Sequence, residues 1–140
     1  MFTTLTVVGL FVLDQDEAID FYVNKLGLEL ASDVQQGPTR WVTVRVPGQP
    51  APEIYLEEPG PPARSEATAE QIRELLTKGG MGFLALTTDD CRTTCETLKA
   101  RGVEFTQEPM EHFYGIDAGV RDPFGNQIRI LQPATPAARV

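Results

Sequence analysis

The sequence contains little from which a metal centre or a membrane anchor could be built. Its 140 residues include one histidine and two cysteines, so a site made of several His or Cys ligands is not expected. No apolar run approaches the ~20 residues of a membrane-spanning helix, and the N-terminus lacks the basic and apolar regions of a signal peptide. We therefore expect a cytoplasmic protein with no membrane partner.

Basic residues are also scarce. Twelve Lys and Arg stand against 20 Asp and Glu, which gives a formal net charge of −8 and a pI near 4.6. Nucleic-acid binding requires clustered Lys and Arg, so nucleic acid is not the expected partner. An acidic chain is compatible with cationic small ligands.

The two cysteines are spaced i,i+4 on a predicted helix. Cβ atoms at this spacing lie about 5–6 Å apart, which exceeds the ~3.8 Å that a disulfide requires. Cys91 and Cys95 are therefore expected to be reduced and to pack as small apolar side chains.

The order of predicted elements is strand, helix, three strands, and it occurs twice. Asp14 matches Asp90 before each helix, Gly27 matches Gly102 after it, and Ile54 matches Ile128 in the last strand. The predicted strands are 5–13, 28–32, 40–46, 53–57, 82–87, 103–106, 115–120 and 127–131, and the helices run from 16 to 26 and from about 89 or 90. This repeat predicts an α+β fold of two β-α-β-β-β modules, whose mixed sheets curl around a central cavity.

We predict a single domain over residues 1–140. Module one covers about 5–57, module two about 82–132, and the tail 133–140 is expected to be frayed. A proline-rich arm over 58–80 joins the modules and carries a helix over 65–78, with a capping box of Thr68 and Gln71 if that helix starts late. The arm is either a plain connection or a lid or dimer arm.

Short motifs give the chain a family resemblance. They are Leu13-Asp14 before a helix that contains Phe21-Tyr22 and ends at Leu26-Gly27, then Tyr114-Gly115, and then the turn Asp122-Pro123-Phe124-Gly125-Asn126. In order and spacing, over about residues 5–132, the chain resembles the vicinal oxygen chelate superfamily. Glyoxalase I, extradiol dioxygenases, fosfomycin-resistance proteins and bleomycin-resistance proteins belong to that superfamily.

In metal-dependent members, the resemblance implies one His, Glu or Gln on each of four strands around a divalent metal. In this chain the four positions fall on Val7, Tyr55, Phe83 and Arg129. Valine and phenylalanine offer no donor atom, tyrosine is a poor ligand, and arginine carries a permanent positive charge. We therefore expect no metal cofactor.

Displaced metal ligands remain an alternative. His112 could combine with Glu111, Glu57 or Asp117, although a lone histidine in a loop is more often a solvated polar residue.

Strand alternation predicts which side chains line the cavity. The candidate ligand-binding residues are Phe11, Trp41, Tyr55, Glu57, Phe83, Tyr114 and Arg129. The aromatic rings would stack on a planar or apolar ligand, with Arg129 or Glu57 fixing its charge. In the alternative, the rings fill a closed core and Arg129 pairs with Glu57.

The leading hypothesis is a metal-independent, non-catalytic binding protein, a homodimer, that sequesters a hydrophobic or aromatic small molecule as bleomycin-resistance-like members do. One alternative is a glyoxalase-like lyase, isomerase or dioxygenase with displaced metal ligands, or a metal-free acid/base catalyst built from Tyr55, Glu57, His112 and Arg129. Another is an interaction or regulatory partner that works through the arm. Whether the modules pair within one chain or swap between chains stays open.

Overall fold

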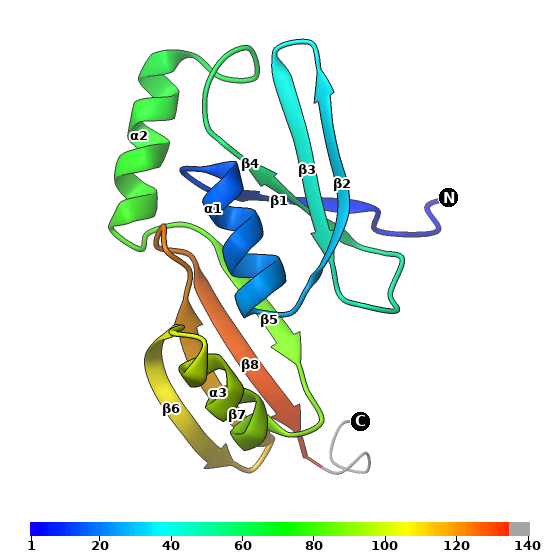
Figure 1. Ribbon diagram of the computed structural model, residues 1–140, viewed down its shortest axis with the longest axis vertical. Helices are drawn as coiled ribbons and strands as arrows, with labels where there is room; N and C mark the ends of the chain where they lie inside the picture. Colours follow the sequence, from blue (N-terminus) through cyan, green and yellow to red (C-terminus); the bar gives the residue numbers. More distant parts are fainter. Residues whose placement is uncertain (135–140) are drawn as a thin grey trace. The chain divides into compact units, whose positions relative to one another are not determined.

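The chain folds into two compact units (Figure 1). The computed structural model describes residues 1–134 and divides the chain into Met1–Lys78 and a second unit from Gly79 onward. The arm helix therefore belongs to the first unit by its contacts. Most of the predicted tail, 133–140, lies outside the described residues, and the single domain stays a prediction.

The first unit contains one four-stranded mixed sheet. Its strands lie in the order β1-β4-β3-β2, with β1 parallel to β4 and the other pairs antiparallel. The elements are β1 Val7–Phe11, α1 Gln15–Ile19, the π-helical η1 Asp20–Lys25, β2 Glu29–Gln36, β3 Thr39–Arg45, β4 Glu53–Glu57 and α2 Glu66–Thr77.

The second unit repeats this plan. Its strands lie in the order β5-β8-β7-β6, again with the first strand parallel to the last. The elements are β5 Phe83–Thr87, α3 Cys91–Ala100, β6 Glu104–His112, β7 Gly115–Arg121 and β8 Gln127–Pro133. The α+β class and the duplicated module are therefore confirmed. A central cavity shared by the two sheets stays a prediction.

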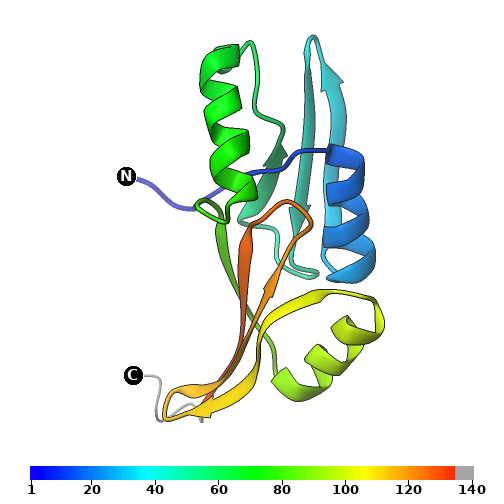
Figure 2. The same ribbon diagram turned by 90° about the vertical axis from the view of Figure 1, so that its left-hand side faces the viewer.

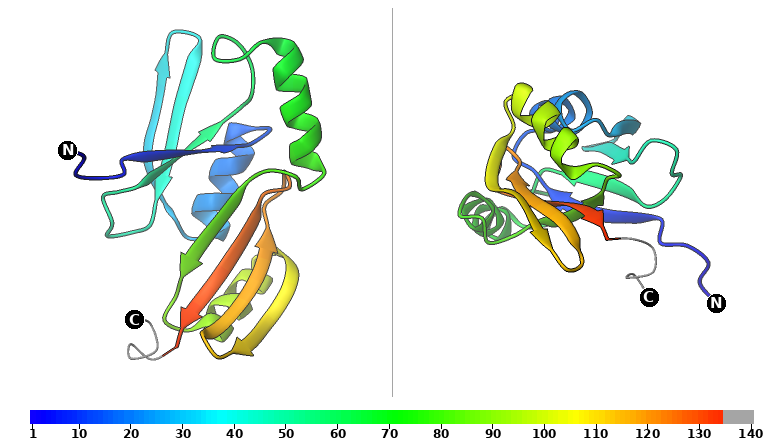
Figure 3. Two further views of the ribbon diagram at one scale, coloured as in Figure 1. Left: turned by 180° about the vertical axis from the view of Figure 1, so that it is seen from behind. Right: turned by 90° about the horizontal axis from the view of Figure 1, so that it is seen from below.

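Each sheet has one face that a helix covers and one face that we call the open face. Figure 2 shows α1 and η1 to one side of strands β2 and β3, and the left view of Figure 3 looks onto the open face of the second sheet, with α3 behind it. The covered face is the core: Leu10, Val42, Val44, Ile54, Leu56, Ile128 and Ile130 are buried. The residues between them in sequence are mostly half-buried or exposed, as the strand alternation predicts.

Aspartates begin the helices of both modules. Asp14 accepts a hydrogen bond from the Glu17 amide at 2.8 Å, and Asp90 accepts one from the Thr93 amide at 3.1 Å. The arm helix begins at its predicted start, where Ser65 caps it and accepts from the amide of Thr68, so the condition for a capping box of Thr68 and Gln71, a late start, is not met. The helix starts early enough for Ser65 to be its N-cap residue.

The cysteines lie on the buried face of α3 and are free. Their Sγ atoms are 4.0 Å apart, which confirms the predicted reduced pair. Burial raises the pKa of Cys95 to about 12 and also raises the pKa of Cys91. Both thiols are therefore protonated at neutral pH and unreactive while the helix stays packed.

Two edge strands are longer than predicted. β2 runs to Gln36 instead of residue 32, and β6 runs to His112 instead of residue 106. Both extensions are polar, and β6 includes Pro109, which an edge strand accepts because it pairs on one side only. His112, expected in a loop, therefore ends a strand.

The turn between β7 and β8 is built around one buried carboxylate. Asp122 Oδ1 accepts the amides of Phe124, Gly125 and Asn126, each at 2.9 Å, and its Oδ2 accepts the Asn126 side chain at 2.6 Å. The side chain of Asn126 packs closely against Gly82. A Cβ added at Gly82 would lie 1.5 Å from Asn126 Oδ1. These contacts fix the start of β8, and with it the position of Arg129.

Candidate functional site

The four positions at which the resemblance implies metal ligands carry Val7, Tyr55, Phe83 and Arg129. Val7 has no donor atom, the side chain of Tyr55 is stacked on a tryptophan, and Phe83 is 66% exposed. Arg129 donates to Asp117 Oδ2 at 2.7 Å, so this carboxylate is already paired with a positively charged side chain. Among residues 1–134, no group of three or more His, Cys, Asp or Glu side chains is gathered as a metal site would require.

An aromatic pair dominates the open face of the first unit. Trp41 of β3 and Tyr55 of β4 stack with ring centroids 4.2 Å apart and an angle of 20° between their planes. Burial raises the pKa of the Tyr55 hydroxyl, and the nearby negative charge of Glu57 raises it further. Tyr55 is therefore a neutral, half-buried ring held by its neighbour in one orientation.

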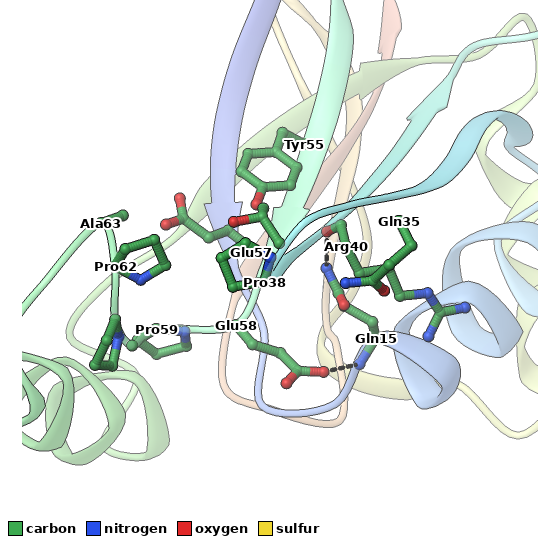
Figure 4. A pocket seen from close by; sticks show the side chains of 13 residues that line it. Gln15, Gln35, Pro38, Arg40, Tyr55, Glu57, Glu58, Pro59, Pro62 and Ala63 are labelled. Carbon is green, nitrogen blue, oxygen red and sulfur yellow. Dashed lines mark hydrogen bonds between the residues drawn. The ribbon is translucent and has the colours of Figure 1, made fainter.

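A cavity of about 300 Å³ lies beside this pair, at the end of β4 (Figure 4). The arm residues Pro59, Pro62 and Ala63 stand on one side of it and Gln15 and Arg40 on the other. Its lining consists of Gln15, Gln35, Pro38, Thr39, Arg40, Tyr55, Glu57, Glu58, Pro59, Gly60, Pro61, Pro62 and Ala63. All of them belong to the first unit, so we call this space the first-unit cavity.

Gln15 fixes the floor of the first-unit cavity. It is buried, and its side-chain amide donates to the backbone carbonyls of Arg40 and Leu56, each at 2.9 Å. Its backbone amide donates to Glu58 Oε2 at 2.8 Å. Glu58 therefore has a fixed position at the cavity although it is an exposed residue.

The arm places a guanidinium group against the open face. Arg64 lies over the ring of Phe11, with its Cζ 4.6 Å from the ring centroid, and forms an ion pair with Glu57 Oε2. The Glu57 side chain is only 15% exposed, so this pair is shielded from solvent. Glu57 and Arg129 each have a partner in their own unit, Arg64 and Asp117, and the alternative of an ion pair between the two stays a prediction.

The open face of the second unit carries polar groups that converge on one carboxylate. Asp117 of β7 is 8% exposed and accepts from Gln107 Nε2 at 3.1 Å, Tyr114 hydroxyl at 3.1 Å and Arg129 at 2.7 Å. His112 Nε2 lies 3.0 Å from its Oδ1. We call these five residues the Asp117 cluster. Burial raises the pKa of Asp117, but the hydrogen bonds from Arg129, Gln107 and Tyr114 outweigh it and hold the pKa below its ordinary value.

Arg129 is held along one edge of its guanidinium group. The same terminal nitrogen donates to Gln107 Oε1 at 3.0 Å and to Asp117 Oδ2 at 2.7 Å. The other terminal nitrogen lies over Gly119, where an added Cβ would approach it to 2.5 Å. Because Gly119 has no side chain, it leaves room for the guanidinium group. The side chain of Arg129 is 31% exposed.

Aromatic side chains border the Asp117 cluster. Tyr114 stacks on the ring of His112 with centroids 4.7 Å apart, and Phe113 meets Tyr114 edge-on. Phe113 is 94% exposed, and both it and Tyr114 lie at the turn that joins β6 and β7.

The structure brings the predicted ligand-binding residues together in two sets. Phe11, Trp41, Tyr55 and Glu57 share the open face of the first unit, and Arg129 and Tyr114 meet at Asp117 in the second. Phe83 lies on the second sheet as an exposed ring, with no ring or cation partner among the described residues.

Sequence reasoning missed Gln15, Glu58 and Arg64. Gln15 directly follows the helix cap, and the other two lie in the proline-rich arm, where no strand pattern assigns a direction to a side chain. The proline run Pro59-Gly60-Pro61-Pro62 was the available signal, because a stiff chain holds the side chains that flank it.

Comparisons with known proteins agree with this architecture. The family model described as Glyoxalase/Bleomycin resistance protein/Dioxygenase superfamily matches residues 4–130. The crystal structure of UcmS2 is 39% identical with a TM-score of 0.89, and the match covers 94% of this chain and 99% of that one. TnmS3, an antibiotic binding protein from Streptomyces sp. CB03234, is 28% identical with a TM-score of 0.76 and coverage of 95% and 98%. An uncharacterized protein from Shewanella frigidimarina is 36% identical over 89% of this chain and 90% of its own length.

Proposed function

Because the chain belongs to the glyoxalase/bleomycin resistance protein/dioxygenase superfamily, we propose that it is a metal-independent, non-catalytic protein that binds a hydrophobic or aromatic small molecule. The observation that carries this proposal is the stacked Trp41–Tyr55 pair beside the first-unit cavity. In metal-dependent relatives the position of Tyr55 holds a metal ligand. Here it supplies a flat ring next to a space of about 300 Å³, at the lower end of the range for small-molecule sites.

Stacking supplies the affinity in this proposal. A ligand ring laid against a fixed aromatic side chain gains about 0.5–1.5 kcal/mol beyond the burial of its area. Tyr55 is already oriented by Trp41, so little conformational freedom is lost when a ligand binds. The similarity to TnmS3, an antibiotic binding protein, supports an antibiotic as the ligand class.

The proposal extends to the second unit and to the assembly. Within the second unit, Arg129 offers the guanidinium edge away from Asp117 to an oxygen of a small molecule, and Phe83 and Tyr114 offer apolar surface. The protein acts as a cytoplasmic homodimer, as is common among small binding proteins with closed symmetry.

The experiment is a titration of protein dialysed against EDTA with bleomycin and a panel of planar aromatic antibiotics. Trp41 is the only tryptophan, so its fluorescence reports on the Trp41–Tyr55 pair without interference. We expect saturable quenching by at least one planar compound, with the same dissociation constant before and after dialysis. One tightly held divalent metal per chain in elemental analysis, or affinity that disappears with EDTA, would overturn the proposal.

A second candidate function, acid/base catalysis without a metal, is favoured by the pairing of His112 with Asp117. A carboxylate 3.0 Å from one imidazole nitrogen orients the ring and leaves its other nitrogen to exchange a proton. This candidate predicts turnover of a panel compound that His112→Ala abolishes while binding persists. Recovery of the unaltered compound after prolonged incubation with the wild-type protein would exclude it for that panel.

A further inference from the structure

The charges around the first-unit cavity do not cancel. Glu57 and Glu58 line it, and so does Arg40, which is paired with both Asp16 and Asp33. With Arg64 bound to Glu57, four carboxylates stand against two guanidinium groups. The surroundings of the cavity therefore carry an excess of two negative charges, within a chain whose formal net charge is −8.

The position of Glu58 leaves acidic oxygen available to a ligand. Its Oε2 accepts the Gln15 backbone amide at 2.8 Å, and that is the contact the structure gives it among residues 1–134. The amide is a neutral donor, so it orients the carboxylate without neutralising its charge. Glu58 thus presents a fixed negative charge at the cavity wall.

The chain already contains a cation held in the same surroundings. Arg64 occupies a site with the Phe11 ring on one side and the Glu57 carboxylate on another. An aromatic face and a carboxylate are the two groups that attract an organic cation. Tyr55 and Glu58 line the neighbouring cavity, and Arg40, the cation in its lining, is already paired with Asp16 and Asp33.

We propose that the first-unit cavity binds the protonated amine of a ligand, with Glu58 as its counter-charge and Tyr55 as an aromatic part of its wall. The proposal rests on the proposed function, because it assigns a charge to the small molecule that this open face holds. The ligand class becomes an aromatic or apolar compound that carries a basic nitrogen.

Three probes of one shape test the charge. They are 2-phenylethylammonium, neutral 2-phenylethanol and anionic 3-phenylpropanoate, each titrated at low salt against the full-length protein and detected through Trp41 fluorescence and calorimetry. We expect the ammonium to bind at least about 5-fold more tightly than the alcohol, which is the factor that a single cation–π contact of roughly 1 kcal/mol provides. The carboxylate is expected to bind least. An equal affinity of the three probes, or a preference for the carboxylate, overturns the proposal.

Variants separate the cavity from the general acidity of the protein. Glu58→Gln is expected to weaken ammonium binding about 2- to 5-fold, the range of a partly exposed ion pair, and to leave alcohol binding unchanged. The matched control is Glu70→Gln on the exposed face of α2, which removes the same charge outside the cavity. If both variants weaken binding equally, the selectivity comes from net charge and the proposal fails.

Arg64→Gln provides the opposite change. It releases Glu57 from its ion pair, so ammonium affinity is expected to rise about 2- to 5-fold. Lys78→Gln at the end of α2 removes an equal charge from an exposed partner, Glu74, and is the control. Lower affinity in Arg64→Gln than in Lys78→Gln would contradict the proposal.

These outcomes are distinguishable from failure of the proposed function. If planar antibiotics bind regardless of charge and the ammonium shows no preference, the proposed function stands and the cation site falls. If the ammonium binds selectively but no aromatic antibiotic in the panel binds, the cation site stands and the proposed ligand class falls.

Discussion

The two units share one strand order and present different chemistry on it. In the first, the open face carries a stacked aromatic pair, and in the second it carries the Asp117 cluster. Tyr55 and Arg129 hold corresponding places. Each is the third residue of the last strand of its sheet in chain order, and they pair with Gly9 and Ala85, respectively. A repeated backbone plan therefore constrains the covered face, while the open face is free to carry different side chains.

The turns before the last strands differ in the same way. The second unit holds its turn through Asp122, whereas the first uses an exposed turn with a single backbone hydrogen bond from Gln49 to Val46. The unit that positions a charged group has the more tightly bonded turn.

The largest effect is expected when Asp122 is removed. Asp122→Ala leaves three buried amides without their acceptor, so the free energy of unfolding is expected to fall by about 3 kcal/mol or more. Calorimetry measures it as a drop in the melting temperature on the order of 10 °C. Gln49→Ala in the matching turn of the first unit is the control, expected within about 0.5 kcal/mol. Equal losses in the two variants would remove the contrast between the turns.

Asp117→Asn is expected to have the next largest effect. The pKa of Asp117 is lowered in the folded protein, so its carboxylate stabilises the fold above the ordinary value of 3.8. That stability is lost as the pH falls through the lowered pKa. The variant is expected to lose about 2–3 kcal/mol at pH 7 and to approach the wild type as the pH falls through the lowered pKa of Asp117.

Urea unfolding at pH 7 and pH 2.5 measures this difference. Asp33→Asn is the control in the first unit, because Asp33 also has a lowered pKa through Arg40 but lies at the surface. Its loss is expected to stay below about 1 kcal/mol. A gap between Asp117→Asn and wild type that persists unchanged at pH 2.5 would show that the charge of Asp117 is not what stabilises the cluster.

Ligand binding tests whether the aromatic pair is the site. Tyr55→Ala is expected to weaken binding of a planar aromatic ligand about 10-fold, since one stacking contact is worth roughly 1.5 kcal/mol. Phe113→Ala removes a ring that is 94% exposed on the second unit and should leave the dissociation constant unchanged. A larger loss of affinity in Phe113→Ala than in Tyr55→Ala would indicate that the ligand binds at the β6–β7 hairpin of the second unit.

The smallest perturbation needs no substitution. Both cysteines lie in α3, so thiol labelling follows the opening of the second unit, while Trp41 fluorescence follows the first. With the pKa of Cys95 raised to about 12, labelling at pH 8 is expected to be at least ~100-fold slower than for a free thiol. Adding urea stepwise shows whether the two signals change together, and fast labelling without urea would contradict the buried position of the thiols.

The sequence predicted the repeated strands and their covered face because both depend on local patterns. Asp14, Asp90 and the turn at Asp122 act on their own neighbours, and alternation along a strand needs no distant partner. Trp41 and Tyr55 were predicted on the same grounds to line the cavity. The structure stacks them on the open face of the first unit, and their role in binding stays a prediction.

The contacts that define the site were beyond sequence reasoning because they join residues far apart along the chain. Gln15 contacts Leu56 across 41 positions, and Arg129 contacts Gln107 across 22. Arg64 depends on the path of an arm that has no strand alternation, so nothing local indicated that it would reach Phe11. The chain has 20 Asp and Glu carboxylates and 12 Lys and Arg side chains, and only the fold selects the pairs.

The parallel pairing of the first and last strands in each unit has a consequence for synthesis on the ribosome. Val7 pairs with Glu53 within one sheet, so the first sheet has all its strands once the chain has emerged as far as Glu57. Nothing in that sheet waits for a strand of the second. The first sheet can therefore form all its strand pairings while the remainder is still being translated, and N-terminal units commonly fold first.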